Sequence, residues 1–459
     1  MGTRFCLKKL YRENPYIFIP IYKLHHSKER RKYLRFLDQS ERWSEDQMCV
    51  WQFKKIKETV EYAYSHVEFY RNKYKAVGYE NGDLKDWKDY YSLPCVSKTE
   101  IKNNPDLFLS DEYRTSGKYR VSYTSGSTDK PLKFYMPFEA QFKEEAFFEY
   151  YWAKYGYRFG ERAVVFRGHQ TIDSEKETFY KYDRMQNFKL FDSRYVSDER
   201  YLWKYDKQIK SFKADTLFAY PSSAYMLAKA YEKSGITPPR FKKIFLGSEN
   251  TYEDQLRYIE EMFKGEAAYH YGHSEGVLLA IKYRDNHFLG FLPQYGHIDE
   301  YDETGKRYGD NELGQIIGTG FSKTMPFIRY KTEDYAIFSG YKSKDFMKNC
   351  TSVERIEGRK HEFVVTKDKR RVSLCSIAGA HMSEMTLVSD MQYEQKEIGK
   401  LIVKVTLLPD TDAAKAKKAI SEKLEAFFEN TVEVETVIVP EIKYSSNGKK
   451  IMLKQALPL

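Results

Sequence analysis

Cysteine is scarce in this sequence of 459 residues, which contains five of them and no C-x-x-C pair. The five are scattered along the chain, at Cys6, Cys49, Cys95, Cys350 and Cys375. An odd, dispersed set provides neither a disulfide framework nor the ligand spacing of a structural zinc site. The pattern fits a reducing compartment, so we expect a cytoplasmic protein.

The sequence has no apolar run of the length that a bilayer requires. The run 16–22 is short, is broken by Pro20 and lacks a small-residue cleavage site, so it is a poor signal peptide. Basic residues lie on both sides of it, at 8–9 and at 28–32. The basic-aromatic lead-in, residues 1–50, therefore either rests on a membrane surface or packs on the body of the protein as a basic helix.

A recognisable nucleic-acid-binding module is also missing, although the formal net charge is +10. Aromatic residues make up 16% of the chain, with 40 Tyr and 30 Phe, but no aromatic–basic RNA-recognition pattern accompanies them. The excess positive charge suits anionic partners, such as ATP or a phosphorylated acceptor. Binding of nucleic acid would rest on net charge alone, and we expect none.

Short apolar strands alternate with helical segments in the middle of the chain. Residues 163–166, 216–219 and 243–246 are expected to be buried strands, and helices are expected within 224–233 and 254–263. Strand–helix alternation predicts α/β layers. Near the N-terminus, apolar residues between 50 and 67 recur at three- and four-residue spacing, which predicts one face of a long amphipathic helix.

The last hundred residues indicate a separate small α+β unit. Residues 401–407 alternate as a strand, 416–427 carry a helical apolar stripe, and 432–438 supply another strand. A chain of this length is expected to form more than one domain. We therefore expect an α/β protein with a large N-terminal domain of layered sheets and helices, residues 1–358, and a small mobile α+β domain, residues 359–459.

The segment 123–131, Tyr-Thr-Ser-Gly-Ser-Thr-Asp-Lys-Pro, has the composition of a phosphate-binding loop. Backbone N–H groups of such a loop can surround a triphosphate, and hydroxyls and a lysine add donors and charge. The spacing is not that of a Walker A motif. Pro131 and the β-prone residues 132–135 predict a strand–loop–strand unit, and the alternative is an ordinary polar hairpin turn.

Four further segments follow this loop: 270–276 (His-Tyr-Gly-His-Ser-Glu-Gly), 326–334 (Pro-Phe-Ile-Arg-Tyr-Lys-Thr-Glu-Asp), 357–361 (Glu-Gly-Arg-Lys-His) and 444–451 (Tyr-Ser-Ser-Asn-Gly-Lys-Lys-Ile). Each one alone is typical of a charged or polar surface turn. Their order and spacing resemble the motifs of the adenylate-forming enzymes, which activate a carboxylate with ATP. The resemblance extends from about Trp51 to the end of the chain.

The resemblance implies a role for most of the polar residues in these segments. Lys449 would drive adenylation, with Lys450 as a neighbouring rival; Glu275 would help to hold Mg²⁺ on the ATP phosphates, and Lys130 would contact those phosphates. Asp334 would accept hydrogen bonds from the ribose hydroxyls. The other expected ATP or AMP contacts are Thr124, Ser125, Gly126, Ser127, Thr128, Ser248, Glu249, Tyr271, Gly272, His273, Ser274 and Arg359, and the expected acyl-pocket residues are Tyr220, Tyr269 and His270.

Two departures from the motifs concern local geometry. Glu333 stands where the family usually has glycine, a residue that permits positive φ. Lys360, His361 and Glu362 stand where relatives often carry hinge aspartates. No Cys–His cluster matches the extra metal site of some relatives.

The branch that the sequence is most similar to is the phenylacetate–CoA ligase-like one, which includes members tied to capsular polysaccharide biosynthesis. Segments 63–71 and 93–98 carry much of this narrower match. It implies ATP, Mg²⁺ and a small carboxylic acid or sugar acid as ligands. The acceptor is expected to be CoA, an amine or a hydroxyl, and the basic-aromatic N-terminal region favours a capsule-related acceptor. A catalytically silent nucleotide-binding scaffold is the alternative of another class.

Overall fold

The structure is a computed structural model that describes residues 15–124, 132–167, 169, 171, 178–196, 198–282, 288–341, 348–359, 363–374, 377, 387–409, 411–442 and 451–457. Its helices are α2 (Pro15–Ser40), α3 (Glu45–His66), α4 (Glu68–Lys75), α5 (Trp87–Ser92), α6 (Lys98–Asn103), η1 (Pro105–Phe108), α7 (Asp111–Ser116), α8 (Ala140–Ala153), η2 (Ser193–Tyr195), α9 (Glu199–Phe212), α10 (Pro221–Ser234), α11 (Glu253–Phe263) and α13 (Ala413–Phe427). Its strands are β1 (Tyr119–Tyr123), β2 (Lys133–Pro137), β3 (Ala163–Phe166), β4 (Tyr180–Asp183), β5 (Phe188–Phe191), β6 (Thr216–Ala219), β7 (Lys243–Gly247), β8 (Glu266–Gly272), β9 (Leu279–Lys282), β10 (Leu289–Phe291), β11 (Gly296–Ile298), β12 (Leu313–Gly320), β13 (Tyr330–Ser339), β14 (Thr351–Arg359), β15 (Phe363–Val365), β16 (Arg371–Ser373), β17 (Val388–Gln395), β18 (Lys400–Leu407), β19 (Glu433–Ile438) and β20 (Leu453–Gln455).

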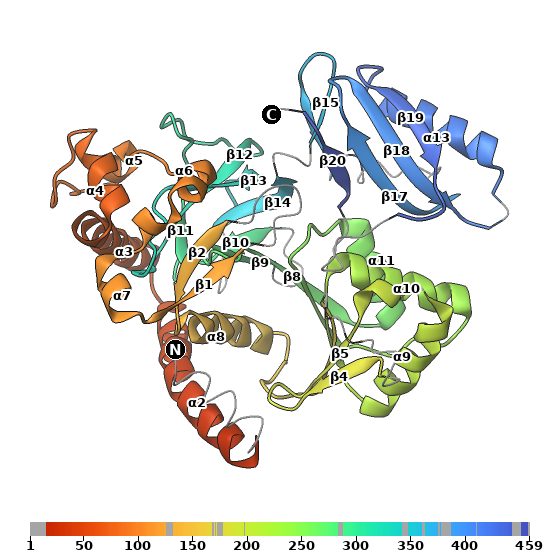
Figure 1. The fold of residues 1–459 in the computed structure, drawn as a ribbon, viewed down its shortest axis with the longest axis horizontal. Coiled ribbons are helices and arrows are strands. Elements are labelled where there is room, and N and C mark those ends of the chain that lie inside the picture. The colour runs from red at the N-terminus through yellow and green to blue at the C-terminus, as the bar shows by residue number, and fades with distance from the viewer. Residues whose placement is uncertain are drawn as a thin grey trace.

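A single hydrogen-bonded sheet of twelve strands runs through the larger part of the molecule (Figure 1). Its order is β11-β12-β13-β14-β10-β9-β8-β7-β6-β3-β5-β4. The strands β5, β3, β6, β7 and β8 are parallel, so the carboxyl ends of these neighbours meet at one edge. In sheets of this kind, ligands bind outside the carboxyl ends of the strands.

Helices cover both faces of the parallel strands. Apolar residues of α9, α10 and α11 form one core with one face of these strands. On the other face, Val165, Phe218 and Phe245 pack with Trp152 of α8. Strands buried on both faces are typical of α/β proteins, and the predicted fold class is confirmed. The strands predicted at 163–166, 216–219 and 243–246 are β3, β6 and β7, and the two predicted helices are α10 and α11.

The C-terminal residues form a second, smaller sheet with its own core (blue in Figure 1). The sheet order is β19-β18-β17-β20, and α13 packs on it through Ile420 and Leu424. The strand–helix–strand series predicted after residue 400 is thus confirmed as β18, α13 and β19. The placement of a domain boundary at residue 359 and the mobility of this unit stay predictions.

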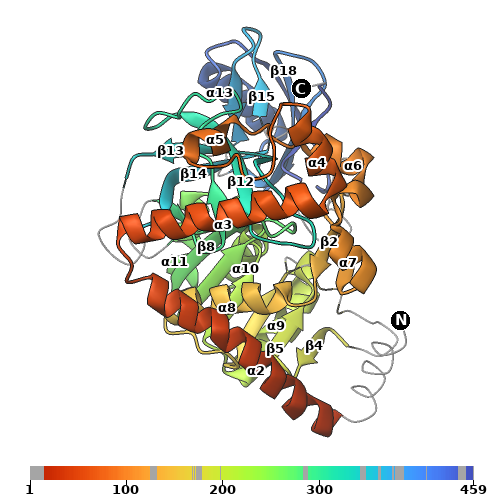
Figure 2. The same cartoon turned by 90° about the vertical axis from the view of Figure 1, so that its left-hand side faces the viewer.

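The N-terminal helices lie along the outside of the large sheet (Figure 2). Helix α3 begins with a capping box, in which Ser44 and Gln47 exchange side-chain and backbone hydrogen bonds. It buries Ile56, Val60 and Ala63, as its apolar spacing predicts. Within α2, Leu37 packs beside α8, and Arg30 pairs with Glu149 at 2.8 Å.

The described end of the lead-in therefore contacts the body of the protein. Contact of the preceding residues with a membrane stays a prediction. Among the described helices, none combines the length and apolarity that a bilayer crossing requires.

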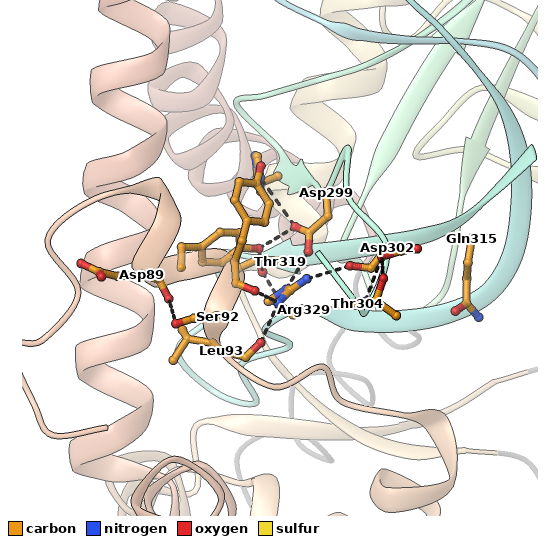
Figure 3. Close-up of polar contacts among 12 residues, drawn as sticks. Asp89, Ser92, Leu93, Asp299, Asp302, Thr304, Gln315, Thr319 and Arg329 are labelled. Atoms are coloured by element: carbon orange, nitrogen blue, oxygen red, sulfur yellow. Dashed lines mark hydrogen bonds and ion pairs between the residues drawn. The ribbon is translucent and has the colours of Figure 1, made fainter. Parts of the chain in front are cut away.

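A buried ion pair joins the N-terminal helices to the large sheet (Figure 3). Arg329 Nε donates to Asp299 Oδ2 at 2.9 Å, and both side chains are almost completely buried. The Arg329 guanidinium also donates to the carbonyl oxygens of Tyr91 and Leu93, and Tyr90 donates to Asp299 Oδ1 at 2.7 Å. Arg329 precedes β13, so this network fixes the start of the strand that carries Asp334.

Candidate active site

The segment after β8 places a buried carboxylate beside β13. Glu275 Oε1 accepts a hydrogen bond of 3.0 Å from the Tyr330 hydroxyl. His273 Nδ1 lies 3.7 Å from Glu275 Oε2, and neither His273 nitrogen is hydrogen-bonded to any residue that the structure describes. Two sequence motifs more than 50 residues apart thus meet at one carboxylate.

Glu275 is ionised at neutral pH. Burial alone would raise the pKa of its carboxyl, but the neighbouring His273 and the Lys98 ammonium outweigh burial and lower that pKa to about 2. Within the described residues, no group of three acidic, histidine or cysteine side chains could hold a metal by itself. A lone carboxylate fits Mg²⁺ that is held mainly by phosphate oxygens and water.

Asp334 lies on β13, in contact with the end of β8. Its Oδ2 accepts a 2.7 Å hydrogen bond from the Tyr271 hydroxyl, and its backbone N–H donates to Thr332 Oγ1 at 3.1 Å. A β-bulge in β13 sets the direction of the Asp334 side chain. Gln315 pairs with Tyr335 and Ile317 pairs with Lys331, so between these pairs β13 has three residues where β12 has one. Bulges re-aim side chains in this way. A carboxylate has acceptor capacity beyond one tyrosine, as binding of two ribose hydroxyls requires.

Glu333 adopts the conformation for which glycine is suited. Its φ is +68°, in the left-handed region. A non-glycine residue there costs about 1–2 kcal/mol. Lys98 Nζ lies 3.7 Å from Glu333 Oε2, and Lys98 also acts on Glu275. The departure from the family motif thus keeps the backbone turn and adds a carboxylate beside Lys98.

The base of the expected phosphate loop is a β-hairpin. Strands β1 and β2 are antiparallel, and Thr124 exchanges two 3.0 Å hydrogen bonds with the backbone of Leu132, one through its own N–H and one through its Oγ1. The predicted strand–loop–strand unit is confirmed in its two strands. Five expected phosphate contacts lie outside the described residues, as do the two lysines of the C-terminal motif: Ser125, Gly126, Ser127, Thr128, Lys130, Lys449 and Lys450.

The remaining expected nucleotide contacts lie in described segments. Ser248 follows β7 with φ +69°, and Glu249 Oε2 accepts a 3.0 Å hydrogen bond from Ser222 N at the start of α10. Gly272 and Ser274 are exposed beside His273. Arg359 ends β14 directly opposite Asp334, and its side chain lies outside the description. The nucleotide role of each residue stays a prediction.

The three expected acyl-pocket residues divide between two faces. Tyr220 follows β6, and its N–H donates to Phe166 O of β3 at 3.0 Å. The His270 ring lies against Phe148 of α8, 4.6 Å between ring centroids. Gly247 leaves room for this ring, since a Cβ there would fall 2.2 Å from His270 Cε1. Tyr269 alternates to the opposite face and packs beside the α9–α11 core.

Two polar residues of this region had no role in the sequence interpretation. Lys98 lay within a segment used only to recognise the branch, and Arg167 directly follows β3. The sequence feature that could have identified Arg167 is a positively charged residue directly after a strand whose residues are all apolar. Such a position places the side chain at the ligand-binding edge of a parallel sheet.

The chain is similar to several known proteins. A family model described as the CapK C-terminal domain matches residues 364–456. Protein CapK of Staphylococcus aureus is 24% identical over 366 residues, which cover 78% of each chain. Phenylacetate-coenzyme A ligase of Pseudomonas putida is 25% identical over 318 residues, 65% of this chain and 68% of the relative. The solved structure of 2-hydroxyisobutyryl-CoA ligase with 2-HIB-AMP, in the postadenylation state, covers 88% of both chains with a TM-score of 0.67 and 16% identity, which supports the fold.

Proposed function

Because the chain belongs to the adenylate-forming superfamily, in the phenylacetate–CoA ligase-like branch with its capsule-associated members, we propose that it is an ATP-dependent, AMP-forming carboxylate ligase. The observation that carries the proposal is the meeting of β8 and β13. There Tyr271 contacts Asp334, and Tyr330 contacts Glu275. Two carboxylates held by tyrosine hydroxyls, one after the end of β8 and one on β13, suit a phosphate-bound cation and a ribose.

The proposed reaction has two steps. A carboxylate oxygen of the acid attacks the α-phosphorus of ATP, the bond from that phosphorus to the β-bridging oxygen breaks, and pyrophosphate leaves. An acceptor then attacks the acyl carbon, and AMP leaves. Asp334 would orient the ribose, and Arg359 would contact ribose or phosphate. Lys449 would neutralise the charge that grows on the α-phosphate, and Lys130 would hold the other phosphates.

Magnesium fits one place in this arrangement. Glu275 would be its protein ligand, and the ion would screen the phosphate charges when it is bound. Tyr330, which donates to Glu275 Oε1, would orient that carboxylate.

The names of the two relatives favour different acceptors. The name of the Pseudomonas putida relative favours the CoA thiol, whereas similarity to CapK favours a role in surface or capsular polysaccharide biosynthesis, with an amine or hydroxyl acceptor. The CapK match spans more of the chain, so we place the acid in surface polysaccharide chemistry.

Pyrophosphate release over a panel of small acids and uronic acids tests the proposal, with mass spectrometry of the product after addition of CoA, an amine or a sugar. We expect one acid class to release pyrophosphate and leave an acyl-AMP. ATP binding without pyrophosphate release for any acid would instead support a silent nucleotide-binding scaffold.

Replacement of Asp334 by alanine is expected to weaken ATP binding about ten- to hundredfold, since a hydrogen bond to a charged group is worth about 1.5–3 kcal/mol. Isothermal titration calorimetry with ATP measures the change. Asp310→Ala is the control, because Asp310 is exposed and its carboxylate accepts a hydrogen bond from a single backbone N–H, that of Gly340. Equal affinity of wild type and Asp334→Ala would remove the ribose role.

Replacement of Glu275 by glutamine is expected to raise the Mg²⁺ concentration for half-maximal pyrophosphate release about tenfold or more. The substitution removes a carboxylate charge that is present at neutral pH. Tyr330→Phe should give a smaller shift in the same direction, since it only frees the carboxylate from its orienting hydroxyl. Full turnover of the wild type in chelator would contradict the metal role of Glu275.

A further inference from the structure

Arg167 is a charged side chain between the sheet and α8 that the proposed chemistry leaves without a role. Its Nη2 donates to Phe245 O at 3.4 Å, and its guanidinium carbon lies 5.6 Å from the centroid of the Phe218 ring. Its Nε is sealed from solvent and has no hydrogen-bond partner among the described residues. A buried N–H donor without a hydrogen-bond partner destabilises the folded protein, and a ligand that accepts this hydrogen bond would offset the cost.

No carboxylate within the described part of the chain forms an ion pair with Arg167. Glu249, at the same sheet edge, accepts its hydrogen bond from Ser222 N. Burial lowers the pKa of Arg167 to about 10, which leaves it charged at neutral pH. Burial and then the Arg167 charge lower the pKa of His270 to about 3, so that ring is neutral. Among the residues that the structure describes, the guanidinium is therefore a positive charge without a carboxylate partner, and aromatic rings surround it.

Three strand ends bring this charge to the expected acyl side of the sheet. Arg167 follows β3, Tyr220 follows β6, and His270 lies near the end of β8. Alternation along the strands places them on the face of Val165, Phe218 and Ala268, which α8 covers. Phe148 of α8 contacts His270 and stacks on Trp152, which in turn contacts Phe218.

We infer that the acid activated by this protein carries a second carboxylate, and that Arg167 binds it while the first carboxylate reacts with ATP. The inference rests on the proposed function. A guanidinium binds a carboxylate through paired N–H donors in a plane, which selects a diacid and fixes its orientation. Phe148, Tyr220 and His270 would contact the apolar stem between the two carboxylates.

Matched acid pairs test this inference: hexanoate with adipate, and phenylacetate with 4-carboxyphenylacetate, assayed by pyrophosphate release with the full-length protein, ATP and Mg²⁺. We expect a kcat/KM at least about tenfold higher for the diacid of a pair that fits. Arg167→Gln should lose about ten- to hundredfold for that diacid and leave the monoacid unchanged, and Arg167→Lys should restore part of the loss. Arg162→Gln is the matched control. Arg162 is exposed and directly precedes β3, at the end of the strand opposite Arg167. Like Arg167, it donates to one carbonyl oxygen and lies near one phenylalanine ring, both of Phe212.

Calorimetric titration of each diacid, with a non-hydrolysable ATP analogue present, separates this inference from the proposed function. Binding that depends on Arg167, without pyrophosphate release from any acid, would support the carboxylate site and overturn the ligase. Release from monoacids and diacids alike, unchanged in Arg167→Gln, would overturn the diacid inference and support the ligase. Equal loss for both members of a pair in Arg167→Gln would also overturn the inference, since Arg167 would then hold the reacting carboxylate or the fold.

Discussion

Arg329→Met is expected to lower the free energy of unfolding by about 3–5 kcal/mol, the cost of leaving a buried charge without its partner. Asp299 is completely buried, and Arg329 is its ion-pair partner. The variant also removes the donors to the Tyr91 and Leu93 carbonyl oxygens. Chemical denaturation with a fluorescence readout measures the loss.

The control for this variant lies two residues further along the chain. Lys331 pairs with Glu303 at 2.7 Å, but Glu303 is largely exposed. An exposed pair contributes about 0–1 kcal/mol, so Lys331→Met should be nearly neutral. Comparable losses in the two variants would show that burial of the Arg329 pair is not what stabilises this junction.

The pH dependence gives the Arg329 prediction a second readout. Burial raises the pKa of Asp299, and Arg329 opposes that shift. In Arg329→Met the folded-state pKa should rise further above the unfolded value. The folded protein then binds a proton that the unfolded chain releases, so stability falls as pH rises through this interval. The loss relative to wild type should therefore be larger at pH 8 than at pH 5.

Lys449→Ala is expected to reduce pyrophosphate release by about 10²–10³-fold, the usual cost of removing one group that stabilises developing charge. Lys449 directly follows Gly448, as the adenylation lysine does in the family that the motif resembles. It would act on the transition state more than on bound ATP, so ATP affinity should change little. Pyrophosphate release and ATP calorimetry on one preparation separate the two effects.

The neighbouring lysine supplies the matched control. Lys450→Ala should keep most of the pyrophosphate release, because only one of the two lysines follows the glycine. When a synthetic acyl-adenylate is supplied, Lys449→Ala should still transfer the acyl group to the acceptor. A dispensable Lys449 beside an essential Lys450 would mean that the motif is displaced by one residue. Failure of both half-reactions would indicate a structural role.

Much of the fold could be predicted from the sequence because each central strand has a simple local pattern. The run at 163–166 is apolar throughout, as a strand buried between helical layers requires, and 401–407 alternates as a one-sided strand does. That the strands from β11 to β14 and those from β3 to β8 belong to a single sheet could not be predicted from such local patterns. It depends on the pairing of β10 with β14, two strands that lie far apart in the sequence and are brought together by packing.

The candidate site was predictable where a motif carries chemistry in neighbouring residues. Asp334 and Glu275 were located by their motifs, but their contacts with Tyr271 and Tyr330 needed the structure, since each pair joins segments that lie far apart in the sequence. Glu333 looked like a misfit in the sequence, yet its φ is that of the expected glycine. The role of Arg167 was not predicted, because it depends on the residues that surround the side chain in the fold. A single positively charged residue after a strand forms no sequence motif.

The aromatic contacts along α8 make Trp152 an intrinsic optical reporter for the acid-binding side of the sheet. Its indole stacks on Phe148, the ring that contacts His270, and it also contacts Phe218, the ring beneath Arg167. Of the other tryptophans, Trp43 and Trp51 form a cluster with Phe36, Trp87 packs on Phe53, and Trp203 is exposed. A variant that keeps Trp152 and replaces the other four tryptophans by phenylalanine would carry a single indole, separated from the guanidinium by the Phe218 ring, and excitation above the tyrosine absorption band would select it. Its emission spectrum would follow arrival of the acid in real time, without a label and without turnover.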